Sequence, residues 1–153
     1  MNLDFTNDNY RFNARVSAII YDKTKTKVLL FKVNDSRDFY MLPGGRIMFD
    51  EDSFTAIKRE IKEELNFELN YKLCAIQENF VKKNNINIMQ YCFCYKAIYD
   101  GIIIDKVFNC LDSDGQVFEW VNIDEIYNYK ILPLSNKELI INQTIDIKHI
   151  IEK

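Results

Sequence analysis

Three glutamates stand close together in the segment REIKEELN, residues 59–66. If this segment is a helix, Glu60, Glu63 and Glu64 are near neighbours, and their like charges repel by about 0.2–0.5 kcal/mol per pair. They also stand toward the C-terminal end of the helix, where the macrodipole favours cations. Oxygen ligands crowded in this way are typical of a site for a hard divalent cation, Mg²⁺ or Mn²⁺. A solvated, charged helix face is the alternative interpretation of the same residues.

An amphipathic helix is predicted to position these glutamates. Four apolar residues recur at helical spacing between residues 53 and 65 and form one face: Phe54, Ile57, Ile61 and Leu65. Glu60 and Glu64 are one turn apart on another side of the helix, and Glu63 flanks them. The carboxylates therefore point away from most of the apolar surface that would pack on a core.

Strand patterns surround this helix on both sides in the sequence. Paired strands are predicted over 14–22 and 27–33, a strand–loop–strand over 39–49, a meander over 67–81 and 86–99, and a further strand over 117–121. Short helices are predicted over 122–127 and 135–143. Because strands precede and follow the helix and no linker or repeat interrupts them, the sequence predicts one α/β domain over residues 1–153.

Composition and charge narrow the class of protein. The chain has 153 residues, of which 48% are hydrophobic and 28% charged, as in an ordinary soluble globular domain. Its net charge of −3 argues against nucleic acid or an anionic membrane as the main partner. No signal-peptide pattern or long uncharged apolar run occurs, so a cytoplasmic location is expected.

The cysteines and the single histidine offer little support for a structural metal centre. The four cysteines form no C-x-x-C pair: Cys74, Cys92, Cys94 and Cys110. They are expected to be buried free thiols, with a disulfide or a metal role as the alternative. A structural zinc site would need four Cys or His ligands, and His149 is the only histidine, so none is predicted.

The stretch GRIMFDEDSFTAIKREIKEELNF, residues 45–67, resembles the Nudix box. That pattern is a glycine, five residues, a glutamate, seven residues, Arg-Glu, an aliphatic residue, any residue, Glu-Glu, any residue, a glycine and an aliphatic residue. Gly45, Glu51, Arg59 and the three glutamates that follow match it in type and spacing. Asn66 replaces the last glycine, and it is expected to keep the left-handed helix end that this glycine provides. The resemblance extends to LPGG before the box and to VFEWVNIDEI after it.

The resemblance implies an α/β/α sandwich around a central mixed sheet, with the box forming a loop–helix–loop. It also implies metal-dependent hydrolysis of a nucleoside diphosphate linked to another group. In this family pattern Glu60 and Glu64 would be the principal ligands of Mg²⁺ or Mn²⁺. Glu63 would be a further ligand, direct or through water, and the backbone carbonyl of Gly44 another.

Other positions of the box acquire supporting roles from the same resemblance. Arg59 would orient Glu60 by a charge-assisted hydrogen bond. Glu51 would brace the loop or reach the metals through water. Arg15 and Arg46 are the candidates for phosphate contacts, and Arg46, directly after the two glycines, is expected to be the better placed.

The general base is predicted outside the box. Mutator-type Nudix enzymes carry an acid in a loop six residues before a tryptophan, and Asp114 stands at that distance from Trp120. Asp112 and Glu119 are the other acids in this run, and DSDG is also an ordinary turn sequence. Glu60 is the main competitor for the role of base.

The substrate is expected to be a small nucleotide-type diphosphate. Residues 82–85, KKNN, carry neither the proline of ADP-ribose enzymes nor the tyrosine of dinucleoside-polyphosphate enzymes. Five aromatic residues could stack on a base, with core packing as the alternative: Tyr10, Phe12, Tyr40, Phe80 and Trp120. A nucleotide-sensing Nudix module without activity and an RNA 5′-pyrophosphohydrolase are the alternative functions. A homodimer is left open.

Overall fold

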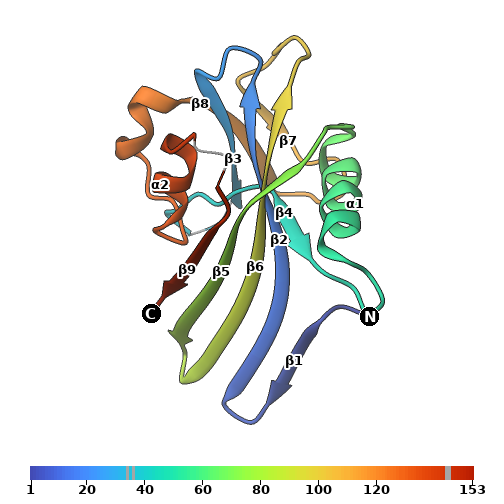
Figure 1. Ribbon diagram of the computed structural model, residues 1–153, viewed down its shortest axis with the longest axis vertical. Helices are drawn as coiled ribbons and strands as arrows, with labels where there is room; N and C mark the ends of the chain where they lie inside the picture. The colour runs from blue at the N-terminus through green and yellow to red at the C-terminus, as the bar shows by residue number, and fades with distance from the viewer. Residues whose placement is uncertain (34, 36, 144–145) are drawn as a thin grey trace.

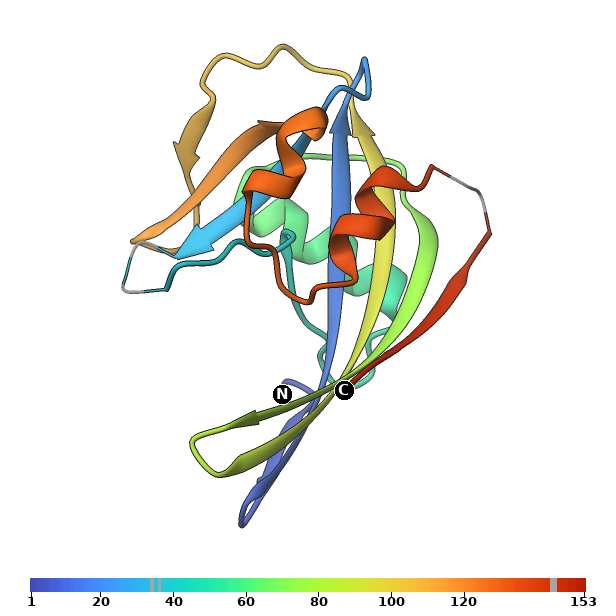
Figure 2. The same cartoon turned by 90° about the vertical axis from the view of Figure 1, so that its left-hand side faces the viewer.

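A mixed β-sheet lies between two helical layers in the computed structural model (Figure 1). The structure describes residues 1–33, 35, 37–143 and 146–153. Helix α1 (Ser53–Leu65) covers one face of the sheet, while the 3₁₀ helix η1 (Ile123–Asn128) and helix α2 (Asn136–Ile141) cover the other. In Figure 2 the last two lie in front of the sheet and α1 lies behind it. The predicted α/β/α sandwich with a single central sheet is confirmed.

Nine strands of the described residues form this one sheet, in the order β7-β8-β3-β2-β6-β5-β9 with β1 and β4 also paired to β2. Their bounds are β1 Asp4–Asn7, β2 Tyr10–Asp22, β3 Lys27–Val33, β4 Gly44–Arg46, β5 Lys72–Lys83, β6 Ile86–Tyr99, β7 Val107–Asn109, β8 Gln116–Asn122 and β9 Lys148–Glu152. The β2–β6 and β5–β9 pairs are parallel and the others antiparallel. The short strands β1, β7 and β9 were not predicted, because their mostly exposed side chains give no apolar alternation.

Strand β2 carries different partners on its two edges. One edge pairs with β6 along the whole strand, whereas the other pairs in turn with β1, β4 and β3. The predicted pairing of 14–22 with 27–33 occurs only at Tyr21 and Val28, beyond which β3 diverges with β8 and β7. The divergence leaves room for β4, so Gly44 and Gly45 lie in a strand rather than in the predicted break.

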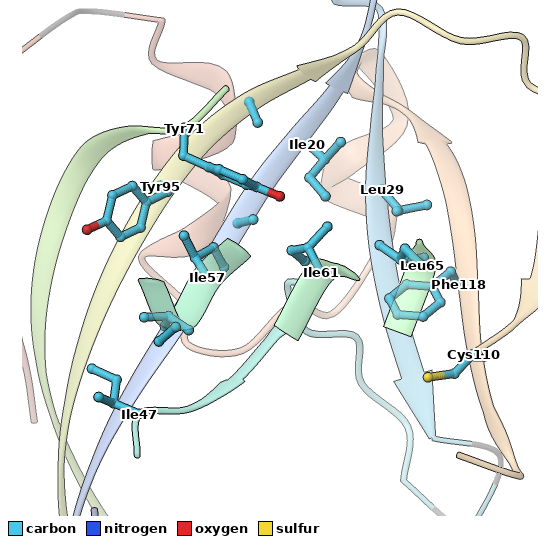
Figure 3. Packing of buried hydrophobic residues seen from close by; sticks show 14 of the residues in the cluster. Ile20, Leu29, Ile47, Ile57, Ile61, Leu65, Tyr71, Tyr95, Cys110 and Phe118 are labelled. Carbon is cyan, nitrogen blue, oxygen red and sulfur yellow. The ribbon is translucent and has the colours of Figure 1, made fainter. Parts of the chain in front are cut away.

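Both faces of the sheet are buried in apolar side chains. Ile57, Ile61 and Leu65 of α1 pack on one face, within the cluster that Figure 3 shows. Ile126 of η1 and the neighbouring residues of α2 pack on the other. Phe54 departs from the prediction, because this residue of the first helical turn is 46% exposed and lies against the edge of Tyr95. No helix among the described residues is long and apolar enough to cross a membrane.

Both ends of α1 are fixed by local hydrogen bonds. Asp52 caps the N-terminus, since its carboxylate accepts from the Thr55 backbone N–H at 2.8 Å. Asn66 caps the C-terminus with a φ of 56°, the left-handed conformation that the sequence predicted, and its N–H donates to the Lys62 carbonyl at 3.0 Å. These two caps hold the helix at the length and rotation that place its carboxylates.

Asn66→Gly is expected to change the free energy of unfolding by less than about 1 kcal/mol, because asparagine already tolerates this conformation. Turnover should stay near the wild-type value, since the role assigned to Asn66 is only to adopt the left-handed backbone conformation that ends the helix. Urea denaturation and steady-state kinetics check the two expectations. A change in turnover of about tenfold or more, which corresponds to about 1.4 kcal/mol in the activation free energy, would contradict this assignment.

Candidate active site

Helix α1 turns two of its glutamates inward and one outward. The Glu60 side chain is 15% exposed and Glu64 is 9% exposed, whereas the Glu63 side chain is 48% exposed. Glu60 and Glu64 are one helical turn apart, and α1 packs against β4. The protein therefore keeps two neighbouring carboxylates largely out of water, which is costly unless a cation or a hydrogen bond compensates.

Arg59 connects the carboxylates of the site. Its Nε and one terminal nitrogen donate to the two oxygens of Glu51 at 2.7 and 2.9 Å, a bidentate pair. The other terminal nitrogen donates to Glu60 Oε1 at 2.8 Å and lies 3.4 Å from Glu63 Oε2. Arg59 also donates to the Arg46 carbonyl at 3.0 Å, so the guanidinium fixes both the helix and strand β4.

The electrostatics separate these carboxyl groups. The hydrogen bonds from Arg59 hold the pKa of Glu51 below its ordinary value despite burial. Burial raises the pKa of Glu60, and Arg59 opposes that rise. Burial, reinforced by the negative charges of Glu60 and Asp112, raises the pKa of Glu64 from 4.5 to about 8. Glu64 is thus the carboxyl group for which a bound cation would compensate most.

Two glycines of β4 make space for this arrangement. A Cβ atom on Gly45 would lie 2.1 Å from the Glu60 Cδ, so any side chain there would displace the Glu60 carboxylate. Gly44 has a φ of +149°, and a Cβ atom on it would lie 2.1 Å from the Val16 carbonyl oxygen. Only glycine fits at either position without a shift of the side chain or the backbone.

The two predicted phosphate-binding arginines lie across β2 and β4 from each other. Arg46 Nε is 2.8 Å from Asp4 Oδ2, so the unpredicted strand β1 supplies this guanidinium with a carboxylate. The positive charge of Arg15 acts on Asp4 as well, and it also opposes the effect of burial on the pKa of both Glu60 and Glu64. Arg15 is therefore close enough to the glutamates of the box for its charge to favour their ionised forms.

The loop between β7 and β8 brings two more ligand-type atoms to Glu64. Cys110 and Asp112 offer a sulfur and a carboxylate oxygen that lie, with a Glu64 oxygen, within 4.8 Å of one another. Cys110 is buried in the core, as predicted, and Asp112 is the acid of this loop that lies near Glu64, whereas the sequence favours Asp114. A predicted strand at β7 would have indicated that this loop lies near the end of α1. The three residues of β7 are too few to show the alternation that predicts a strand.

The family model of the NUDIX domain matches residues 11–143. The chain belongs to the Nudix family. Its family acts on phosphorus-containing anhydrides as pyrophosphohydrolases, and the chain is an enzyme of this class. None of the curated proteins compared with it matches its sequence.

Solved structures with the same fold have low sequence identity to this Nudix chain. The MutT protein from Bacillus halodurans is 20% identical and superposes with a TM-score of 0.67, covering 90% of this chain and 89% of that one. The E. coli dihydroneopterin triphosphate pyrophosphohydrolase is 16% identical with a TM-score of 0.66, over 83% and 91%. The MutT protein from Methanosarcina mazei is 19% identical with a TM-score of 0.57, over 88% and 94%. At these identities the likeness shows the fold.

Nudix hydrolases generally need a divalent cation, and the residues of this site fit one. Glu64 Oε2 is completely buried and has no hydrogen-bond partner among the described residues. A bound cation would supply the partner that this buried carboxylate oxygen lacks. The Glu60 carboxylate lies one turn away, with one oxygen held by Arg59. The site can therefore offer at least two inward-facing carboxylates to a hard ion.

Asp114 lies in the exposed turn that precedes β8. Within the described part of the chain its carboxylate makes no hydrogen bond or ion pair. Gly115, with a φ of +75°, completes the turn. The general base assigned to Asp114 stays a prediction, because its carboxylate would have to meet the attacking water in the complex with substrate.

Asp114→Asn is expected to lower turnover by about 10²–10⁴-fold if this carboxylate takes the proton of the attacking water. The rise in Tm caused by Mg²⁺ should stay at the wild-type value, because Asp114 is not assigned as a ligand. Steady-state kinetics and thermal melting with and without Mg²⁺ check both parts. Unchanged turnover would return the role of base to Glu60.

The five aromatic candidates for base stacking occupy different environments. Trp120 is buried and its ring lies 5.8 Å from that of Tyr99. Phe12 and Tyr40 make edge contacts with Tyr91 and Tyr129, at 5.5 and 5.2 Å between ring centroids. Tyr10 and Phe80 are exposed and line an apolar groove formed by β1, β2, β5 and β6. Packing against other aromatic rings therefore accounts for the first three.

Proposed function

We propose that this chain is a divalent-metal-dependent pyrophosphohydrolase that cleaves the diphosphate linkage of a nucleoside diphosphate joined to another group. The observation that carries the proposal is the partly desolvated pair Glu60 and Glu64, of which Glu64 has a completely buried oxygen without a hydrogen-bond donor. Such a pair is unfavourable by itself and becomes favourable with a cation. The structural resemblance to MutT proteins and to a dihydroneopterin triphosphate pyrophosphohydrolase supports the same reaction class.

In this proposal the residues of the chain divide the work of the reaction. Glu60 and Glu64 hold the cation, with Glu63 and the Gly44 carbonyl as further ligands, direct or through water. Mg²⁺ or Mn²⁺, when bound, neutralises charge on the diphosphate and lowers the pKa of the attacking water. Arg59 keeps Glu60 in position through its hydrogen bond of 2.8 Å. Its bidentate pair with Glu51 prevents the guanidinium from turning away.

Arg15 and Arg46 are proposed to contact the phosphates of the substrate. Arg15 is supported by its charge interaction with the buried Glu60 and Glu64, and it forms no salt bridge within the described part of the chain that a phosphate would have to displace. Arg46 would have to exchange its contact with Asp4 for one with phosphate. A diphosphate ester is the anion that suits two arginines and a divalent cation on one side of the sheet.

A hydrolysis screen with Mg²⁺ or Mn²⁺ tests the proposed function; its products, a nucleoside monophosphate and pyrophosphate or a phosphomonoester, are separated and quantified by chromatography. The substrates are nucleoside triphosphates, sugar nucleotides, ADP-ribose, dinucleotides, dihydroneopterin triphosphate and triphosphorylated RNA. Turnover of a small diphosphate that depends on the added metal and is lost in Glu60→Gln supports the proposal. Binding without turnover of any of them would identify a nucleotide-sensing module instead. Preference for triphosphorylated RNA would identify an RNA 5′-pyrophosphohydrolase.

We further propose a cytoplasmic location and action as one domain. All four cysteines are buried free thiols, as predicted, which suits a reducing compartment. A single sheet takes strands from both ends of the described chain, β1 and β9. A homodimer stays a prediction, and sedimentation equilibrium of the purified protein would decide it.

A further inference from the structure

A thiol lies at the margin of the candidate active site, although a hard cation does not bind thiol ligands. The Cys110 sulfur donates a hydrogen bond to Asp112 Oδ1 at 3.0 Å. Both groups lie within 4.8 Å of the Glu64 carboxylate. Mg²⁺ is bound by oxygen atoms, whereas thiolates select softer ions. The function proposed above leaves Cys110 without a role.

The loop that carries this thiol is fixed to the body of the protein. The Cys110 N–H donates to the Gln116 carbonyl at 2.9 Å, and the Leu111 N–H donates to the Glu64 carbonyl at 3.0 Å. Cys110 also belongs to the apolar cluster that includes Leu65 and Phe118, as Figure 3 shows. The thiol is therefore held beside the C-terminal end of α1 rather than placed there by an unrestrained loop.

A second and independent observation is the state of the Glu64 side chain. It is more than nine-tenths buried, and its Oε2 atom has no hydrogen-bond partner in the described part of the chain. Neither Cys110 nor Asp112 satisfies that oxygen, although both belong to the same cluster of ligand-type atoms. A positive charge placed among the three groups would supply the partner that Glu64 Oε2 lacks.

We propose that Glu64, Cys110 and Asp112 form a site for a thiophilic divalent ion of the Zn²⁺ or Co²⁺ kind. One sulfur and two carboxylate oxygens are a ligand set that such ions accept, with a fourth position open to water or substrate. Binding of the ion would release the proton of the Cys110 thiol to solvent. The resulting thiolate and the Asp112 oxygen, which are now joined by that proton in a hydrogen bond, would both bind the ion. Donor atoms around a tetrahedral ion stand about 3.3–3.6 Å apart, and the atoms of this cluster lie within 4.8 Å of one another, so movement of the exposed Asp112 side chain would close the site.

The site shares Glu64 with the cation site of the proposed function but does not rest on that function. Glu60 and Glu63 are outside the cluster of atoms that includes the thiol. Because both sites need the Glu64 carboxylate, a thiophilic ion bound to Cys110 would compete with Mg²⁺ for it. The chain would accordingly discriminate among metals through one cysteine.

Titration of the metal-free protein with Co²⁺ tests the proposal directly. A thiolate ligand gives Co²⁺ an intense charge-transfer absorption in the near ultraviolet, which oxygen ligands do not give. We expect this band in the wild-type protein, its loss on addition of Zn²⁺, and its persistence in roughly 100-fold excess Mg²⁺. Cys110→Ser should abolish it, and Cys92→Ser, at an equally buried thiol outside the cluster, should retain it.

A carboxylate variant keeps the test decisive if replacement of the buried thiol harms folding. Asp112 is exposed, so Asp112→Asn should fold as the wild type does and should weaken Co²⁺ binding by at least about 10-fold. Asp114→Asn is the matched control and should leave the Co²⁺ titration unchanged. Absence of the band from the wild type, or its survival in Cys110→Ser, would overturn the proposal whatever the hydrolysis screen gives.

Discussion

Glu64→Gln is expected to lose most of the hydrolytic activity and to gain stability in the absence of metal. The activity should fall by roughly 10³-fold, since a ligand of the cation that neutralises the diphosphate is removed. The stability should rise because the folded state raises the pKa of Glu64 to about 8, whereas an exposed glutamate titrates near 4.5. Replacement of Glu64 by a group that does not titrate would thus separate activity from stability.

The sign of the stability effect follows from proton binding. Between pH 4.5 and pH 8 the folded protein keeps the Glu64 proton that the unfolded chain releases. The free energy of unfolding of the wild type therefore falls as the pH rises through this window. Glutamine has no such loss. At about 1.4 kcal/mol per pH unit over the roughly three units in which only the folded protein keeps the proton, we expect the variant to be more stable by about 4 kcal/mol at pH 8 and nearly equal at pH 4.5.

Urea denaturation at both pH values in the presence of a chelator measures this difference. Glu63→Gln is the matched control for stability, because the Glu63 side chain is half exposed and its replacement should change the free energy of unfolding by less than about 0.5 kcal/mol. Mg²⁺ should raise the Tm of the wild type more than that of Glu64→Gln. Equal stability at pH 8 together with an undiminished response to Mg²⁺ would contradict the assignment.

Gly45→Ala is expected to lower turnover by about 10²-fold or more while the protein remains folded. The added methyl group would lie 2.1 Å from the Glu60 Cδ, and the side chain can move away at a modest cost in stability. The carboxylate would then leave its hydrogen bond with Arg59 and its place beside Glu64. Misplacement of a reacting group by 1 Å can cost about 10²-fold in rate.

Gly44→Ala provides the contrast for this prediction. Its methyl group would meet the Val16 carbonyl oxygen at 2.1 Å, and its φ of +149° is unfavourable for alanine. Backbone cannot yield as a side chain does, so the free energy of unfolding should fall by at least about 2 kcal/mol. Thermal melting and kinetics of both variants compare the effects, and a Gly45→Ala protein with wild-type turnover would contradict the role of the glycine.

The box and its helix could be predicted from the sequence because their signals are local. The apolar spacing of α1 and the left-handed residue Asn66 both depend on neighbours within a few residues. The short strands β1, β7 and β9 lacked such signals, and the first two bring residues to the site that are distant from the box in sequence. Asp4 on β1 contacts Arg46, and the loop after β7 places Asp112 beside Glu64. Contacts of this kind depend on topology, which a single sequence specifies only weakly.

The divided edge of β2 has a consequence for how the protein opens. Strands β2 and β6 are paired along the whole of β2, so the amide hydrogens that take part in this pairing should exchange with deuterium only on global unfolding. The unit of β3, β8 and β7 is joined to β2 at one residue pair, Tyr21 and Val28, so it should exchange by a smaller, sub-global opening. Glu64 belongs to the first part and Cys110 to the second. A ligand that binds both Glu64 and Cys110 would hold these two parts together. It would therefore slow amide exchange throughout β3, β8 and β7, including at residues that it does not contact.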